Sequence, residues 1–136
     1  VSSTSERFAA IQKLSDEGLY TGILMMPILP FINDTIENIS NIVKMASSSG
    51  AKYIYPAFGV TLRANQRQYF FKKIGPELTK KYIDTFGDSY SCASPNHKIL
   101  KKKFEELCKK YGILYKMKDI VSEGYKYIKE EQVSLF

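Results

Sequence analysis

The sequence predicts an α/β fold with parallel strands, and three features of residues 1–62 lead to this prediction. Residues 23–26 (ILMM) form a continuous apolar run, which is typical of a strand covered on both faces. Residues 52–58 (KYIYPAF) are rich in β-forming side chains and end against Pro56 and Gly59. A helical pattern precedes each run. The order helix, strand, helix, strand indicates a right-handed βαβ unit with one further helix in front.

Both predicted helices carry recognisable start signals. Residues 3–17 begin with the capping-box pattern STSE and end before Gly18, a residue suited to the left-handed conformation that closes a helix. Residues 34–50 repeat the signal, with Asp34 as the predicted cap and Glu37 three positions later. The apolar side chains of both segments recur at helical spacing, so each helix is expected to bury one face.

The loop PILPFIND (27–34) separates the first strand from the second helix. Pro27 and Pro30 each lack a backbone donor, so a regular central strand cannot continue beyond Met26. Loops that leave the carboxyl ends of parallel strands commonly bind ligands, so Asn33 and Asp34 are candidate site residues. The alternative is a strand-to-helix connection without any chemistry.

The second half of the chain is predicted to be helical and basic. Residues 63–136 hold sixteen basic and nine acidic side chains and seven of the ten tyrosines. This mixture suits a nucleic-acid backbone and exposed bases. A solvated, lysine-rich helical surface is the alternative. The predicted elements are helices over 63–74, 77–86, 95–111 and 119–131, a polar loop over 87–96, and a short strand after Gly112.

Neither a metal site nor a disulfide framework is expected from two cysteines and one histidine. Cys108 falls on the apolar stripe of its helix and is predicted to be an inert core thiol. Cys92 lies in the polar loop and is the only plausible reactive thiol, although no neighbouring residue in the sequence lowers its pKa. His97 fits the first turn of a helix. No apolar run is long enough to cross a bilayer and no signal peptide is recognised, so a cytoplasmic protein is expected.

Several motifs carry a resemblance to a known family. They are Arg7, PILPFIND (27–34), Gly50-Ala51, GVTLR (59–63) and YSCASPN (90–96). Over about residues 7–120 the chain resembles the carboxyl-terminal half of radical S-adenosylmethionine proteins of the DNA repair photolyase-like group, which is related to spore photoproduct lyase. Two departures stand out. The cysteine triplet C-x3-C-x2-C of that family is absent, and Phe31 stands where family members often have glycine.

The resemblance implies a more specific fold than the sequence patterns do. Residues 1–62 would be the last βα units of an incomplete parallel (β/α) barrel, residues 63–131 a helical basic extension, and residues 132–136 a mobile tail. The chain would be a fragment of a longer enzyme that uses a [4Fe–4S] cluster to cleave S-adenosylmethionine to a 5′-deoxyadenosyl radical. Without the three cysteines and the earlier barrel strands, the fragment itself is expected to bind no cluster, to bind S-adenosylmethionine weakly or not at all, and to be inactive alone.

By the same resemblance, the chain would keep part of the wall of the S-adenosylmethionine-binding site. Arg7 would be a partner of the carboxylate and Arg63, beyond the second strand, another. The loop would supply apolar contacts, and Asn33 and Asp34 would supply polar ones. An ordinary solvated arginine is the alternative for Arg7. No catalytic residue is identified. The expected cofactor-binding residues are Arg7, Pro27, Ile28, Pro30, Asn33, Asp34 and Arg63.

The last five residues resemble the pentapeptide by which bacterial DNA polymerases and repair proteins bind the sliding clamp. Val133 stands where leucine is more usual. DNA, the sliding clamp and a second copy of the chain, paired through an open sheet edge, are therefore the expected partners. The rival function is a non-catalytic adaptor for nucleic acid or the clamp. The motif residues are Gln132, Val133, Ser134, Leu135 and Phe136.

The double substitution Leu135→Ala/Phe136→Ala is expected to abolish binding of the chain to a purified bacterial sliding clamp. Each fully buried side chain of this size contributes about 1.5–3 kcal/mol before ordering costs, so the pair should dominate the affinity. Gln132→Ala should weaken binding less, because its amide orients the peptide. The measurement is calorimetric titration of the three chains with the clamp. Equal affinities, or no binding by the unaltered chain, would make the match a chance one.

Overall fold

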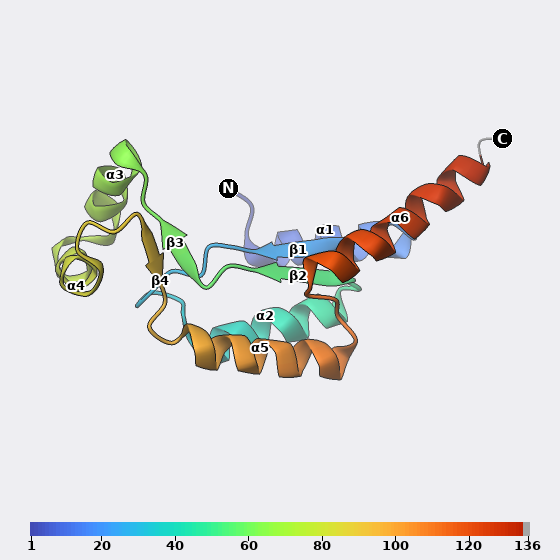
Figure 1. The fold of residues 1–136 in the computed structure, drawn as a ribbon. Helices are drawn as coiled ribbons and strands as arrows, with labels where there is room; N and C mark the ends of the chain where they lie inside the picture. Colours follow the sequence, from blue (N-terminus) through green and yellow to red (C-terminus); the bar gives the residue numbers. More distant parts are fainter. Residues whose placement is uncertain (135–136) are drawn as a thin grey trace.

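The computed structural model describes the backbone of residues 1–134 and the side chains of residues 1–128. Figure 1 shows short strands in the middle of the molecule with helices around them. The chain forms mixed helix and strand, as predicted. The elements in order are α1 (Thr4–Asp16), β1 (Gly22–Met25), α2 (Ile36–Ser48), β2 (Tyr53–Pro56), β3 (Gly59–Thr61), α3 (Ala64–Ile74), α4 (Pro76–Phe86), β4 (Ser91–Ala93), α5 (His97–Tyr111) and α6 (Met117–Ser134).

Strands β1 and β2 pair in parallel, with Ile23 opposite Ile54. A third segment adds to β2 through a parallel bridge between Tyr53 and Leu114. There the amide of Ile54 donates to the carbonyl of Leu114 at 2.9 Å, and the amide of Leu114 donates to the carbonyl of Lys52 at 3.0 Å. The predicted parallel α/β arrangement is therefore present. The described residues do not close into a barrel.

Helices α2 and α5 lie side by side against one face of this sheet (Figure 1). The core between them and the strands includes Val43, Ile54, Leu100 and Phe104, each at most 1% exposed. The predicted apolar stripe of α5 is thus confirmed. The stripe of α5 therefore shares one hydrophobic core with β1, α2 and β2. The domain division predicted after residue 62 stays a prediction.

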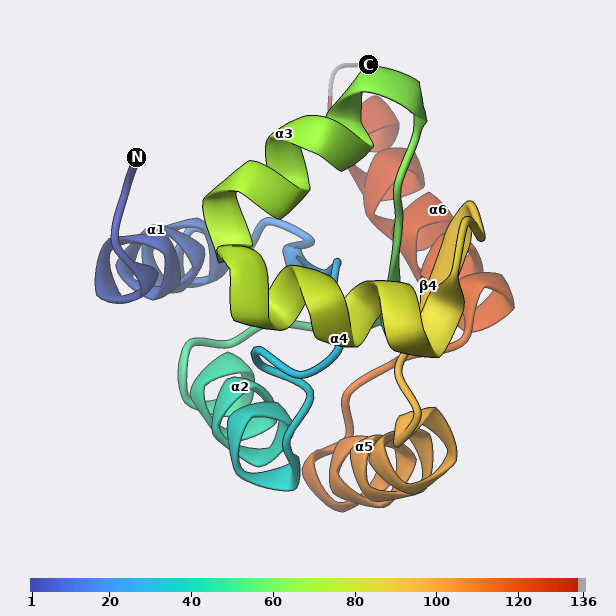
Figure 2. The same cartoon turned by 90° about the vertical axis from the view of Figure 1, so that its left-hand side faces the viewer.

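Between β2 and α5 the chain makes an insert of β3, α3, α4 and β4. Strands β3 and β4 pair antiparallel, with Val60 opposite Cys92, and the two helices stand at the end farther from the main sheet (Figures 1 and 2). Tyr82, 1% exposed, is the centre of a small aromatic core that includes Phe70, Phe71 and Phe86. The region predicted as the polar loop 87–96 therefore contains a strand, β4. Its three residues are too few to show a strand pattern in the sequence.

The residue that caps each helix start is the predicted one at α1 and a different one at α2 and α5. At α1 the predicted capping box forms, and hydrogen bonds from the backbone and side chain of Ser3 lower the pKa of Glu6. At α2 the cap is Thr35, whose hydroxyl accepts from the amide of Asn38 at 3.1 Å. At α5 the cap position is Asn96. The predicted caps Asp34 and Ser94 have other roles, described below.

Helix α6 is attached near its start and then leads away from the sheet (Figure 1). The hydroxyl of Tyr20 donates to the carbonyl of Ile120 at 2.8 Å, and the Tyr20 ring stacks on Tyr127 at 4.9 Å. The helix continues to Ser134, so residues 132–134, which were expected to belong to a mobile tail, are helical. The side chains of the predicted clamp motif, and all of residues 135–136, lie outside the described part of the chain. None of the helices in the described residues could span a bilayer.

The insert is joined to the rest of the molecule by the hydroxyl of Tyr82, which donates to the carbonyl of Pro30 at 2.8 Å. Tyr82→Phe is expected to lower the free energy of unfolding by about 1–2 kcal/mol, because it leaves a buried carbonyl without a partner. Tyr69→Phe is the matched control, since Tyr69 is 66% exposed and should change stability little. Urea unfolding of the three chains measures this. Equal stability of Tyr82→Phe and the unaltered chain would contradict it.

Candidate functional site

The PILPFIND loop at the carboxyl end of β1 is held in shape by its own side chains. The Asn33 amide oxygen accepts from the backbone N–H of Leu29 at 2.6 Å, and Asp34 Oδ1 accepts from that of Phe31 at 2.9 Å. The side-chain amide of Asn38, on α2, donates to the backbone carbonyl of Asn33 at 2.9 Å. These bonds fix the loop backbone without any ligand.

Asp34 is 6% exposed, and its second oxygen accepts from the hydroxyl of the fully buried Ser94 at 2.5 Å. The Ser94 hydroxyl also accepts from the amide of Asn96 at 3.1 Å, and the Ser94 amide donates to the carbonyl of Phe58 at 2.9 Å. Both carboxylate oxygens of Asp34 therefore bind groups of the protein. The Asp34 side chain thus joins the loop to the start of α5 and does not line the groove described below, and its contact with a cofactor stays a prediction.

Phe31 adopts a φ of +63°, in the left-handed region that favours glycine. Its ring packs edge-on against Tyr82 with centroids 5.6 Å apart, and the Lys81 ammonium lies 4.7 Å from the ring centre. The backbone of this position thus suits the glycine often found in the resembling family. The phenylalanine side chain instead binds the loop to α4.

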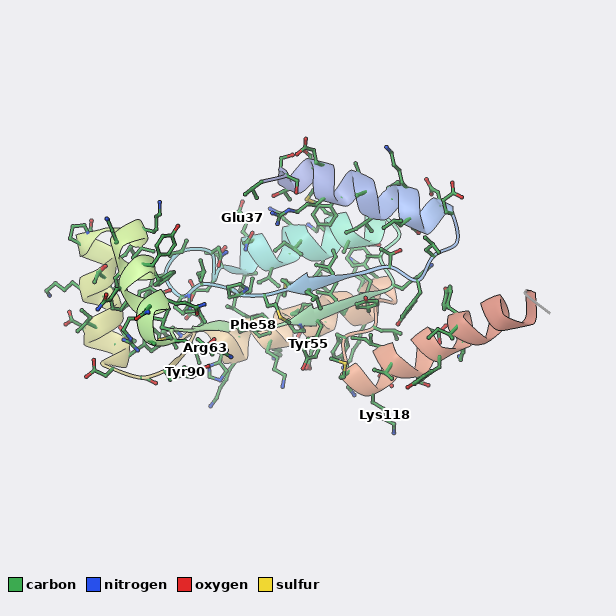
Figure 3. All side chains as sticks on the ribbon, turned by 90° about the horizontal axis from the view of Figure 1, so that it is seen from above. Glu37, Tyr55, Phe58, Arg63, Tyr90 and Lys118 are labelled. Atoms are coloured by element: carbon green, nitrogen blue, oxygen red, sulfur yellow. The ribbon has the colours of Figure 1, made fainter. Side chains whose placement is uncertain are left out.

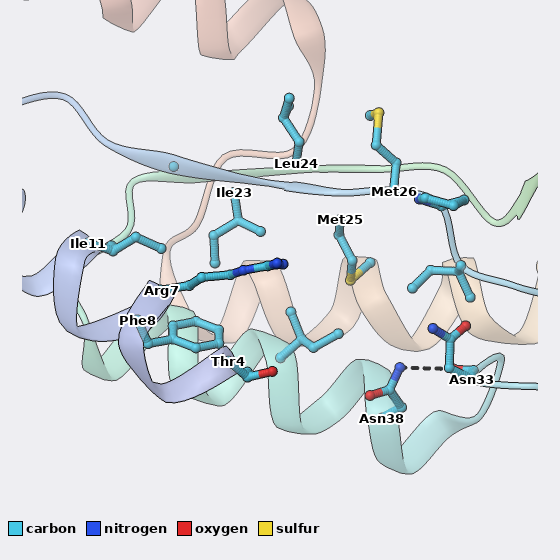
Figure 4. A pocket seen from close by; sticks show the side chains of 14 residues that line it. Thr4, Arg7, Phe8, Ile11, Ile23, Leu24, Met25, Met26, Asn33 and Asn38 are labelled. Atoms are coloured by element: carbon cyan, nitrogen blue, oxygen red, sulfur yellow. Dashed lines mark hydrogen bonds between the residues drawn. The ribbon is translucent and has the colours of Figure 1, made fainter. Parts of the chain in front are cut away.

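A groove of about 430 Å³ lies between α1, β1 and α2. Arg7 comes from α1, whereas Pro27, Ile28 and Asn33 come from the PILPFIND loop. Figure 4 labels Arg7 and Asn33. Arg7 extends along the groove, and its Nε donates to the hydroxyl of Ser2 at 3.2 Å. Four of the seven predicted cofactor-binding residues therefore line one groove, although they are up to 26 positions apart in the sequence.

The other three predicted residues lie elsewhere. The buried Pro30 accepts the Tyr82 hydrogen bond with its carbonyl, and Asp34 is bonded to Ser94. Arg63 precedes α3 on the insert, where its Nε donates to the hydroxyl of Tyr90 at 2.5 Å. The predicted site is therefore only partly assembled, because the insert holds Arg63 and the loop turns Asp34 away from the groove.

The groove also contains residues that the sequence did not identify as site residues. Thr4 and Phe8 come from α1, Met25 forms part of the strand, and Asn38 lies on α2 close to Asn33 (Figure 4). One sequence feature could have identified Asn38 as a site residue. An amide side chain three residues after a helix cap is well placed to hydrogen-bond the preceding loop. No sequence feature could have identified Thr4 and Phe8, because their position depends on how α1 packs beside β1.

Both cysteines are buried, which corrects the prediction for Cys92. It is 1% exposed on β4, and burial raises the pKa of its thiol despite the opposing effect of the Arg67 guanidinium. Burial, with a further contribution from the Glu105 carboxylate, raises the pKa of the Cys108 thiol to about 12. Among the described residues, no group of His, Cys, Asp and Glu side chains is arranged to hold a metal ion.

Comparisons with protein families, with curated proteins and with solved structures found no significant match to this chain.

Both native thiols are expected to react slowly with a disulfide reagent at pH 8. The reagent needs the thiolate, and a thiol pKa of about 12 for Cys108 lowers its thiolate fraction by roughly three orders of magnitude relative to an exposed cysteine. Ser91→Cys adds an exposed thiol on the same strand as Cys92 and should react fast. Spectrophotometric rates in native and denatured protein test this. A native Cys92 as fast as the added thiol would contradict the buried placement.

Proposed function

We propose that the chain is the carboxyl-terminal part of a cytoplasmic radical S-adenosylmethionine enzyme that acts on DNA or is recruited to it. In this proposal the groove between α1, β1 and α2 is one wall of the S-adenosylmethionine site. One observation supports it above the others: Arg7, Pro27, Ile28 and Asn33, expected at that site from the family resemblance, line a single groove at the carboxyl end of β1.

The chemistry of the groove suits a ligand that is apolar along its length and carries a carboxylate. Ile23, Met25 and Ile28 provide apolar surface for methylene groups or an adenine ring. Arg7 forms no ion pair with a described side chain, so its guanidinium is available to a carboxylate. The Asn33 oxygen is used by the loop, which leaves its amide N–H groups as the donors for a ligand.

The chain does not supply ligands for a [4Fe–4S] cluster. Cys92 and Cys108 are buried in separate cores, one in the insert and one beneath the main sheet. Two separated thiols cannot replace three cysteines around one cluster. The cluster in this proposal therefore belongs to residues outside the present chain, and the residues here contribute only to binding and orienting S-adenosylmethionine.

A second proposal is a non-catalytic adaptor for nucleic acid or the sliding clamp. Its support is the basic second half, on which Tyr69, Tyr90 and Tyr125 are 51–66% exposed. Self-association of the chain is compatible with both proposals. Strand β1 is an edge of the described parallel sheet, and Leu24 on it is 65% exposed, so a second copy or further strands could cover this side.

S-adenosylmethionine is expected to bind the chain with a dissociation constant near the millimolar range, about −4 kcal/mol, because only one wall of the site is present. Amide chemical-shift changes should be confined to the groove, around Arg7, Asn33 and Asn38. Arg7→Gln should weaken S-adenosylmethionine but not 5′-methylthioadenosine, which lacks the carboxylate.

Lys13→Gln is the matched control, since it removes one exposed charge from the same helix. Scattered shifts, or an equal effect of Lys13→Gln and Arg7→Gln, would argue against the proposed site. Micromolar affinity would contradict the prediction that this chain alone binds S-adenosylmethionine weakly.

A further inference from the structure

A second cavity, of about 460 Å³, lies at the carboxyl ends of β2 and of the segment through Leu114. It is separate from the groove beside α1 and shares no lining residue with it. In parallel α/β folds this edge of the sheet is where ligands commonly bind. Its walls combine aromatic rings with ammonium groups, principally Tyr55, Phe58, Phe104, Tyr115, Lys101 and Lys116.

The aromatic walls are fixed in place by Phe104, which is 1% exposed. Its ring meets Phe58 and Tyr115 edge-on, each with a centroid distance of 5.9 Å. Tyr55 is half-buried, lines the cavity, and stacks on no aromatic ring among the described residues. Figure 3 shows Tyr55 and Phe58 on the same side of the molecule. Prearranged ring faces of this kind bind planar bases by stacking.

Two lysines bring positive charge to the cavity, one from α5 and one from the segment before α6. The Lys116 ammonium lies 5.9 Å from the centre of the Tyr115 ring, and Lys101 reaches in from α5. Glu105 is the one carboxylate of the lining, but its 4.0 Å contact with Lys101 joins two partly solvated side chains and is weak. The ligand that complements two ammonium groups beside aromatic rings is a planar base that carries an anionic group.

We propose that this cavity binds a nucleoside phosphate, with the base against Tyr55 and Tyr115 and the phosphate between Lys101 and Lys116. The ligand is either a free nucleotide or one residue of a single-stranded nucleic acid. Along the same side of the molecule, Arg63 and Tyr90 form an exposed, hydrogen-bonded pair that offers a second charge and a second ring (Figure 3). The proposal uses none of the groove residues and can hold or fail independently of S-adenosylmethionine binding.

The test follows the backbone amides of residues 55–58 and 115–117 by nuclear magnetic resonance while the whole chain is titrated. Adenosine monophosphate should shift these amides, and adenosine or inorganic phosphate alone should shift them less. A single-stranded oligodeoxyadenylate distinguishes the two sources. Tighter binding of the oligonucleotide identifies single strands as the ligand, and equal binding identifies a free nucleotide.

The variant Lys101→Gln/Lys116→Gln should weaken whichever ligand binds by about tenfold. Lys109→Gln/Lys110→Gln removes the same charge from the far end of α5 and should leave the affinity within about twofold. Thermal unfolding checks that both variants fold. Equal weakening by the two variants, absence of shifts at the cavity, or duplex DNA binding as tightly as the single strand would each overturn the proposal.

Discussion

The buried hydrogen bond between Asp34 and Ser94 is the interaction on which the rest of the structure depends. It joins the loop after β1 to the start of α5 across 60 positions of sequence. A carboxylate this deeply buried is costly unless its oxygens are hydrogen-bonded, and here the Phe31 amide and the Ser94 hydroxyl supply those bonds. The position of α5, and through it the whole core beneath the sheet, is thereby coupled to the shape of one loop.

The same bonds explain what the groove can and cannot offer a ligand. The loop uses the Asn33 side-chain oxygen, and Asp34 faces away from the groove with its oxygens bonded to Phe31 and Ser94, so neither side chain offers a ligand in the groove a free acceptor. A wall held by internal bonds loses little entropy when a ligand binds. The carboxylate-binding capacity then rests on Arg7, the one long cationic side chain that lines the groove.

Local patterns predicted much of the fold, and long-range contacts account for what they missed. The capping box of α1, the two parallel strands and the apolar stripe of α5 all follow from neighbouring residues. The role of Asp34 depends on Ser94, and the groove depends on the packing of α1 beside β1, so neither follows from spacing. The packing of α5 in the main core likewise depends on long-range contacts, since the insert separates this helix from β2 in the sequence.

The insert leaves the α/β unit and returns to it at one point, because Gly59 and Ala93 are paired neighbours across β3 and β4. Gly59 permits that closeness, since a Cβ there would lie 2.6 Å from the carbonyl oxygen of Cys92. The 35 residues from Gly59 to Ala93 therefore form a side branch of the parallel sheet, and the two ends of this branch are adjacent. Such a branch can change length or sequence during evolution while the path of the main chain through the sheet stays the same.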